Sequence, residues 1–228
     1  MNTTKKTFWV IAVAAIIGLS MAACSGPSGG GGGLDPIPGP PPYSIGDTGP
    51  GKGIIFYYDP AGFTVEGYGK PGDAGYFASY TAHYLELAPS DSGTAAWGAD
   101  GEGSIGVTHI YNEVSAPELL VKIGNGRKDT QLIVAYLTQY PESPDRAAQL
   151  AIVPQGGQSD WFLPSMGELV KLNISGVSGF SSGLYWTSSQ QSSYYAWAGV
   201  LEGLELGVGG YSAYSKLNSY AVRAIRAF

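Results

Sequence analysis

Cysteine is almost absent from this chain, because Cys24 is the single one among 228 residues. A disulfide within one chain, a thiolate zinc site and a Cys-Cys redox pair each need at least two cysteines, so all three are excluded. Histidine is nearly as rare, and His83 and His109 lie too far apart in the sequence for the short spacings of a zinc motif. The sequence therefore predicts no metal site built on Cys and His.

Charge is also scarce, since only 13% of the residues are Asp, Glu, Lys or Arg. The 18 acidic residues outnumber the 12 basic ones, and the net charge of −6 becomes −8 once the segment holding Lys5 and Lys6 is removed. An acidic chain is repelled by phosphate backbones, so nucleic acid is not an expected partner. Glycine (35 residues) and tyrosine (16) are abundant, which is typical of a loop-rich, β-containing extracellular domain.

No apolar run reaches the length of a comfortable transmembrane helix, which is about 20 residues. Residues 8–19 are apolar, follow two lysines and precede small residues, which is the pattern of a cleaved signal peptide over residues 1–23. The sequence MAAC at 21–24 resembles a bacterial lipoprotein lipobox, which implies that Cys24 is the first mature residue and carries lipids. Ordinary secretion with cleavage near Ala22 or Ala23 is the alternative.

Residues 25–42 read SGPSGGGGGLDPIPGPPP, from which no hydrophobic core can form. The glycine half is flexible and the proline half favours extended polyproline II, so residues 24–42 are predicted to be a lipidated tether. The remaining residues, 43–228, are predicted to fold as one domain. The expected location is the cell envelope (outer membrane, cell surface or periplasmic face), with the membrane as a partner through the lipid anchor.

Hydrophobic patterning divides this domain into short strands around a helical middle. It predicts helices over 127–140 and 147–151, the second with Ser143 as N-cap, and a third helix from the capping box of Ser165 and Glu168. Strands are predicted at 54–58, 84–88, 185–188, 197–201, 204–208 and 221–228. This order predicts an α+β, mostly antiparallel fold, and we expect the first and last strands to pair with each other. Broken alternation between Val222 and Ile225 predicts a bulge in the last strand.

Three motifs stand out: DWFLPS at 160–165 followed by Glu168-Leu169, YWTSS at 185–189, and AW at 196–197 with VRAIR at 222–226. Together they resemble the family of the C-terminal domain of the bacterial collagen-like adhesin Lcl, found in secreted and lipid-anchored bacterial proteins. The resemblance implies a C-type-lectin-like fold with two main helices, a small antiparallel sheet, paired terminal strands and a long-loop face. It does not fix a ligand.

Physical arguments also predict structural roles for the motif residues. Trp161 and Leu163 precede the capped helix and are expected to hold its start against the core. Trp186 and Trp197 are expected in adjacent strands, where they fill the space between sheet and helices. Arg223 and Arg226 are predicted to pair with Asp160 or Glu168.

The stretch 187–221 is the strongest candidate for contact with a ligand. Of its 35 residues, 17 are Ser, Tyr or Gly, and only Glu202, Glu205 and Lys216 are charged. Antibody paratopes share this composition, because Tyr supplies rigid contact area and Ser and Gly supply adaptable fit. The alternative is a β-meander whose tyrosines stack across strands. The predicted ligand-contacting residues are Ser192, Tyr194, Tyr195, Tyr211, Ser212, Tyr214, Ser215 and Tyr220.

This stretch further resembles the variable cassette of lectin-fold lipoproteins, including spirochaetal variable surface proteins, that are targets of diversity-generating retroelements. Those systems rewrite adenines, so that Asn codons become Tyr, Ser, Gly and a few others. Only Asn218 remains as Asn between Tyr194 and Tyr220. The resemblance therefore implies a diversified binding face over residues 190–220.

Catalytic signatures are weak, so no catalytic residue is assigned and the chain is not predicted to be an enzyme. The glycines at 49–53 favour a β-turn over a phosphate loop. No cofactor is predicted, although the acidic group Asp91, Asp100 and Glu102 is compatible with calcium.

The leading hypothesis is a lipid-anchored, extracytoplasmic, adhesin-like module that binds a protein or a glycan. A secreted hydrolase or sugar-processing enzyme on the same fold, and a structural envelope lipoprotein, are the alternatives.

Overall fold

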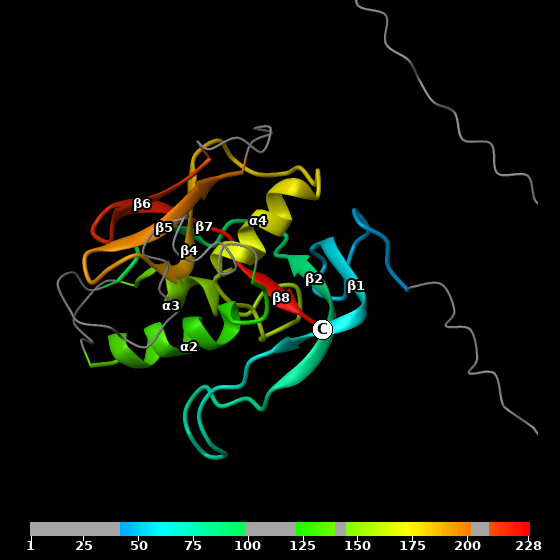
Figure 1. Ribbon diagram of the computed structural model, residues 1–228, viewed down its shortest axis with the longest axis horizontal. Coiled ribbons are helices and arrows are strands. Elements are labelled where there is room, and N and C mark those ends of the chain that lie inside the picture. Colours follow the sequence, from blue (N-terminus) through cyan, green and yellow to red (C-terminus); the bar gives the residue numbers. More distant parts are fainter. Residues whose placement is uncertain (1–41, 99–121, 140–144, 202–209) are drawn as a thin grey trace, which may run out of the picture. The chain divides into compact units, whose positions relative to one another are not determined.

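The computed structural model describes residues 42–98, 122–139, 145–201 and 210–228. Residues 40–228 form one compact unit, to which all of the following applies. Its described part contains three helices and two small sheets, so the predicted α+β class is confirmed (Figure 1). The predicted signal peptide, Cys24 and the tether up to residue 41 lie outside the described residues, as does the predicted strand 204–208. No helix in the described ranges is long and apolar enough to cross a membrane.

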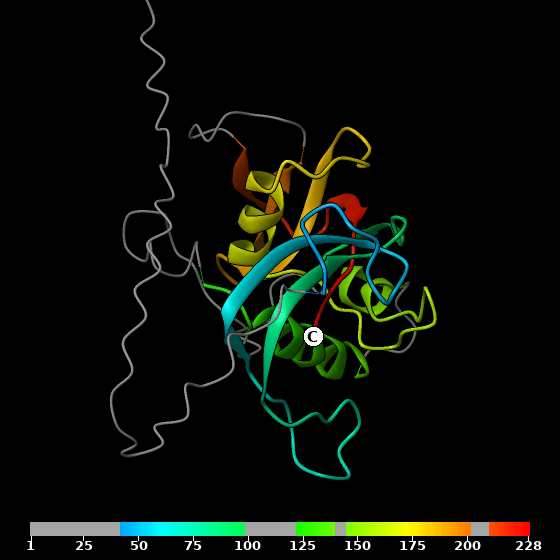
Figure 2. The same cartoon turned by 90° about the vertical axis from the view of Figure 1, so that its right-hand side faces the viewer.

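The smaller sheet has the strand order β1-β2-β8. Strand β1 (Ile54–Val65) and strand β2 (Tyr80–Leu87) form a long antiparallel hairpin, and β8 (Ile225–Ala227) pairs with the far side of β2. In Figure 2, β1 and β2 are the long curved strands in cyan and teal. The expected direct pairing of the first and last strands is therefore wrong. The two strands share a sheet, but β2 lies between them because it follows β1 closely in the chain.

The larger sheet has the order β3-β7-β4-β5-β6. It is antiparallel except for the contact of β4 with β7, and its strands are β3 (Gly93–Ala96), β4 (Leu184–Gln190), β5 (Tyr195–Val200), β6 (Tyr211–Ser215) and β7 (Ser219–Val222). The bulge predicted near the C-terminus is instead a change of sheet. Val222 ends β7 in the larger sheet, and Ile225 begins β8 in the smaller one. The alternation breaks there because the two residues pack into different cores.

Helices cover both faces of the larger sheet. On one face, α2 (Gly126–Leu137) and α3 (Ala147–Ala151) pack on a core that includes Trp186. On the other face, α4 (Met166–Ile174) contacts β4, β5 and β1 and thereby joins the two sheets (Figure 1). The N-cap of α3 is Arg146, whereas the expected cap Ser143 lies outside the described residues. The first turn of α3 is stabilised by Gln149, whose side chain accepts a hydrogen bond from the Arg146 N–H at 2.8 Å.

The capping box of α4 is confirmed. The Ser165 hydroxyl accepts the Glu168 N–H at 3.3 Å, and the Glu168 carboxylate accepts the Ser165 N–H at 2.7 Å. Glu168 also accepts the Gly124 N–H at 2.8 Å, so it fixes the segment before α2 as well. Burial raises the pKa of Glu168, and the three backbone N–H groups around it oppose that rise.

The predicted tryptophan core is confirmed, since Trp161, Trp186 and Trp197 are 1%, 0% and 5% exposed. The indole N–H of Trp186 donates to the Ala95 carbonyl at 2.9 Å, so its polar edge is satisfied. Trp197 faces the opposite side of the sheet and packs on Met166 of α4. The sequence reading missed Trp97, which is 1% exposed and donates to the Thr187 carbonyl at 2.6 Å. Together these side chains fill the interior on both faces of the larger sheet.

The two motif arginines hold separate ion pairs. Arg226 pairs with Asp160, as expected, and also with the fully buried Glu86. Arg223 pairs with Asp91 at 2.8 Å, so its expected pairing with Asp160 or Glu168 is wrong. The strand change at residues 223–224 directs the Arg223 side chain toward Ala88 and the loop after β2.

Candidate ligand-contact surface

Two neighbouring turns of the larger sheet carry its most exposed apolar side chains. Tyr194, in the turn from β4 to β5, is 54% exposed, and Tyr195, the first residue of β5, is 47% exposed. Leu217, in the turn from β6 to β7, is 59% exposed. We call these three residues, with the adjacent Ser192 and Ser215, the turn surface. Large side chains left in solvent at this level are a common feature of interaction sites when they cluster.

Serine hydroxyls shape both turns. The Ser192 hydroxyl accepts the N–H groups of Tyr194 and Tyr195 at 3.3 and 3.2 Å, and the Ser215 hydroxyl accepts the Leu217 N–H at 3.3 Å. Such local side-chain bonds satisfy backbone groups that a turn would otherwise leave to water. The two predicted contact serines therefore orient the aromatic and aliphatic side chains beside them.

A buried lysine joins the two turns. The Lys216 N–H donates to the Tyr194 carbonyl at 3.0 Å, which places the two turns side by side. The Lys216 side chain is 2% exposed, and its Nζ lies 2.8 Å from the Gln190 Oε1 and 4.5 Å from the centre of the Trp97 ring. Burial of this long side chain costs conformational entropy that its hydrogen bond and ring contact offset. The turn surface thus rests on an ordered polar and aromatic base.

Three further predicted contact residues lie on the face of the sheet that α2 and α3 cover. The rings of Tyr214 and Tyr220 meet edge to face at 5.2 Å, and Tyr220 lies 4.8 Å from Trp186. Both tyrosines are half-buried, and the Asn218 amide donates to the Tyr220 hydroxyl at 2.8 Å. The tyrosine rings therefore stack with each other, as the alternative reading expected, although β6 and β7 are not neighbours in the sheet. Ser212, in the same part of β6, is exposed.

Tyr211 is the one predicted contact residue that lies away from the others, at the far end of β6. Its ring covers Gly199 so closely that a side chain at position 199 would collide with it. Burial raises the pKa of Tyr211. Its position beside α4 indicates a packing role. The role in ligand contact remains a prediction for all eight residues.

Leu217 is the residue that the sequence reading missed. It was overlooked because a Tyr, Ser and Gly count does not register an isolated leucine. Ser215, Asn218 and Ser219 between two alternating strands form a turn signal, and a leucine among them has no core to enter. That signal could have found it.

Charged groups with catalytic or metal-binding potential are dispersed in the described ranges. They contain no group of three His, Cys, Asp or Glu side chains that could hold a metal ion. Of the predicted calcium candidates, Asp91 is engaged by Arg223, and Asp100 and Glu102 lie outside the described residues. His83 lies on the surface with its Nδ1 3.0 Å from the Asp59 carbonyl oxygen, and His109 lies outside the described residues.

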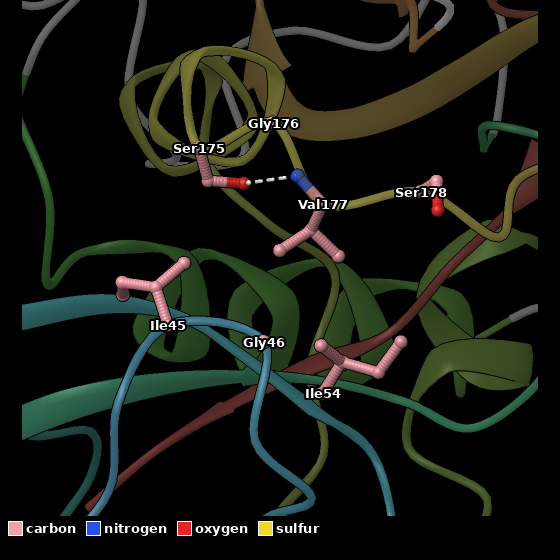
Figure 3. Close-up of a pocket in the computed structure, with 7 residues that line it drawn as sticks. All are labelled: Ile45, Gly46, Ile54, Ser175, Gly176, Val177 and Ser178. Carbon is pink, nitrogen blue, oxygen red and sulfur yellow. Dashed lines mark hydrogen bonds between the residues drawn. The ribbon is translucent and has the colours of Figure 1, made fainter.

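Two hollows lie away from the turn surface. One of about 310 Å³ lies between the loop before β1 and the loop after α4, and Ile45, Ile54 and Val177 point into it (Figure 3). The Ser175 hydroxyl beside it accepts the Val177 N–H at 3.2 Å, so this polar group is already used. The other, of about 530 Å³, lies beside α2 and has Asp73 and Gln131 in its lining. The Asp73 carboxylate there accepts the Lys70 N–H at 2.8 Å and serves its own loop.

Comparison with known proteins finds no matching family and a solved structure of low similarity. No family model matches the chain, and no curated protein matches it. A solved structure of a fimbrial protein from Bacteroides ovatus is similar to it with a TM-score of 0.48 and 16% sequence identity. The match covers 77% of this chain and 44% of the fimbrial protein, so this chain spans less than half of that protein's length.

Proposed function

We propose that the protein is a lipid-anchored, extracytoplasmic, adhesin-like module that binds a protein or glycan ligand through the turn surface. The observation that carries the proposal is the exposure of Tyr194, Tyr195 and Leu217 on two turns that a buried lysine joins. Aromatic side chains on a rigid base contribute much to binding, because little conformational freedom is lost when they are covered.

The placement of the turns suits a tethered module. The described chain begins at residue 42, on the right of Figure 1, whereas the two turns lie at the left end of the larger sheet. The proposed tether therefore joins this domain at a place away from the turn surface, so attachment by a flexible tether does not occupy that surface.

The proposal includes the C-type-lectin-like fold and the Lcl C-terminal family. Its support is that residues of all three motifs are buried and form the scaffold: Trp161, Trp186, Trp197 and Arg226. It also includes a retroelement-diversified face, for which the exposed turns offer sites that can vary at little cost to folding. DNA beside the gene should then contain a near-copy of the coding segment for residues 185–228, with differences mainly at adenines. Identical codons in sibling isolates, with no such repeat, would contradict the diversification.

The proposal assigns no catalytic role and no cofactor. A hydrolase on this fold would lose its activity after replacement of one or two acidic residues. A binding module instead loses affinity stepwise as its contact side chains are truncated. These two patterns distinguish the proposal from the enzymatic alternative.

The test compares the full protein with a Tyr194→Ala/Tyr195→Ala variant on arrays of glycans and of extracellular proteins. We expect any ligand of the wild-type protein to lose at least about tenfold in affinity, because truncation of a central aromatic typically costs more than 1 kcal/mol. Tyr76→Ala is the matched control, since Tyr76 is also exposed (39%) but lies in the loop between β1 and β2. Equal affinity of the double variant and the wild type would contradict the proposal. Absence of any ligand would favour a structural envelope lipoprotein.

A further inference from the structure

Strand β6 lies at the outer edge of the larger sheet (Figure 1). Among the strands that the structure describes, its one neighbour is β5. Its sequence, YSAYS, contains no charge and no proline, and its pairing with β5 is continuous from Tyr211 to Ser215 without a bulge. Native proteins usually blunt an edge with one of these devices, because an open edge pairs readily with another strand.

The register shows which backbone groups of β6 point outward. The Val200 N–H donates to the Gly210 carbonyl at 2.8 Å, and the Lys216 N–H donates to the Tyr194 carbonyl at 3.0 Å. Hydrogen-bonded pairs recur at every second residue of an antiparallel ladder, so Ser212 and Tyr214 also bond to β5. The backbone N–H and C=O groups of Tyr211, Ala213 and Ser215 therefore point away from β5, and of these the Ser215 carbonyl already accepts the Asn218 N–H at 3.0 Å.

The edges of the smaller sheet are interrupted or covered, since β1 contains Asp59 and Pro60 and has two register shifts against β2. On β1, the Ile55 N–H donates to the Asp47 carbonyl at 2.9 Å, and its carbonyl accepts the Gly46 N–H at 2.8 Å. On β8, Ile225 exchanges two hydrogen bonds with Phe162, both of 2.9 Å. At the opposite edge of the larger sheet, β3 has four residues and begins at Gly93 with a positive φ of 116°. In the described part of the chain, β6 is thus the longest edge without such protection.

We propose that two copies of this chain pair through β6, antiparallel and around a two-fold axis at Ala213. The outward residues 211, 213 and 215 are symmetric about Ala213, so such a pair is in register with itself. Tyr211 lies opposite Ser215 of the partner subunit, and Ala213 lies opposite Ala213 of the partner subunit. No like charges meet, because β6 carries none. The two larger sheets become one continuous sheet across the axis.

This interface is isologous, which is the commonest form of pairing between identical chains. It is small, so the dimer should form in a concentration-dependent way. Attachment of the chains to one membrane would favour it, because it raises their effective concentration. The inference does not depend on the proposed ligand binding, because the pairing uses backbone groups of β6, whereas Ser215, which belongs to both, contributes its side-chain hydroxyl to the turn surface.

Cysteine cross-linking of the full protein tests the register. Directly opposed residues of a hydrogen-bonded pair have Cα atoms about 5.5 Å apart, within the range of a disulfide, so Ala213→Cys should give a covalent dimer under mild oxidation. Ser212→Cys is the matched control: Ser212 would lie opposite Tyr214 of the partner subunit, and the two copies of residue 212 would be diagonal, about 7–8 Å apart. Cys24 is present in both variants and in the wild type, so its contribution is the same in all three.

We expect the Ala213→Cys variant to form dimers at least about tenfold faster than the Ser212→Cys variant. Equal rates, or no dimer beyond the wild-type level, would overturn the proposal. Pairing of β6 with an extended segment of a different protein would also give no Ala213→Cys dimer.

A charge exchange provides the second test. Two lysines, or two glutamates, directly opposite each other repel, so Ala213→Lys and Ala213→Glu should each sediment as monomers at concentrations where the wild type forms dimers. A mixture of the two variants should restore a dimer containing one copy of each, which also shows that both variants fold. A dimer that persists in the Ala213→Lys variant, or a mixture that stays monomeric, would contradict the proposed pairing.

Discussion

Replacement of Glu86 should destabilise the domain more than replacement of any exposed acidic residue. Glu86 is fully buried and receives N–H groups from Gly51 (2.9 Å) and Gly53 (2.8 Å) and a guanidinium N–H from Arg226 (3.1 Å). The loop at 49–53, whose glycines superficially resemble a phosphate loop, thus binds a carboxylate of its own chain. Gly53 is required there, because a side chain would collide with the Leu87 carbonyl.

The magnitude follows from what Glu86→Ala leaves behind. Arg226 stays buried with Asp160 as its remaining acidic partner, and two backbone N–H groups lose their acceptor. Loss of one member of a buried ion pair costs about 3–5 kcal/mol. This is a large share of the roughly 5–15 kcal/mol that stabilises a typical domain. Glu86→Gln keeps the shape and one acceptor oxygen, so it should cost about 1–3 kcal/mol.

The assay is equilibrium unfolding in urea, followed by tryptophan fluorescence and circular dichroism so that two-state behaviour is checked. Glu66→Ala is the matched control, because Glu66 also pairs with cations but its side chain is 35% exposed. Its loss should cost about 1 kcal/mol or less. If Glu86→Ala cost no more than Glu66→Ala, the reasoning about the buried carboxylate would be refuted.

Three further predictions concern the core, the pH dependence and the anchor. Trp186→Ala should cost about 3–5 kcal/mol in urea unfolding, whereas Tyr194→Ala should cost about 0.5 kcal/mol or less; equal losses would contradict the division into core and exposed turn. The hydrogen bond from Lys122, above all, lowers the pKa of Glu66 from its ordinary value of 4.5, so its stabilising effect is present above that pH and is lost as the pH falls through the lower folded-state pKa. Glu66→Gln should therefore reduce acid sensitivity slightly in pH-dependent melts, and an unchanged or steeper acid dependence would be contrary to this. Mass spectrometry of the N-terminal peptide from membranes should find acylated Cys24 as the first residue, and an unmodified Cys24 would exclude the lipid anchor.

Local features of the sequence predicted local structure well. The capping box at Ser165 and the buried tryptophans at 161, 186 and 197 were predictable, because each depends on neighbouring residues or on the size of one side chain. The class of fold followed from the order of these elements. The lengths of the strands were harder to predict. Strands β1 and β2 are longer than the predicted runs, because their pairing with each other extends them past residues of low β-propensity.

Long-range partners could not be predicted in the same way. Nothing near Arg223 in the sequence indicates Asp91, and nothing near Gly51 indicates Glu86. Local patterns also do not determine which strands pair with each other, so they could not predict that β2 lies between the first and last strands. At the candidate site, the composition of 187–221 indicated the region, but burial separates Tyr211 from Tyr194, and only the fold determines burial.

The central claim is that the turn surface, and not the whole Tyr-rich stretch, binds the ligand. A surface-displayed alanine scan of residues 187–201 and 210–221, scored for folded display and for binding to a ligand identified on the arrays, tests it most directly. The account predicts that alanine at Tyr194, Tyr195 or Leu217 lowers binding at least about tenfold with display unchanged, whereas alanine at Trp197 lowers display. Binding that is insensitive to all three exposed positions, with display intact, would contradict the claim.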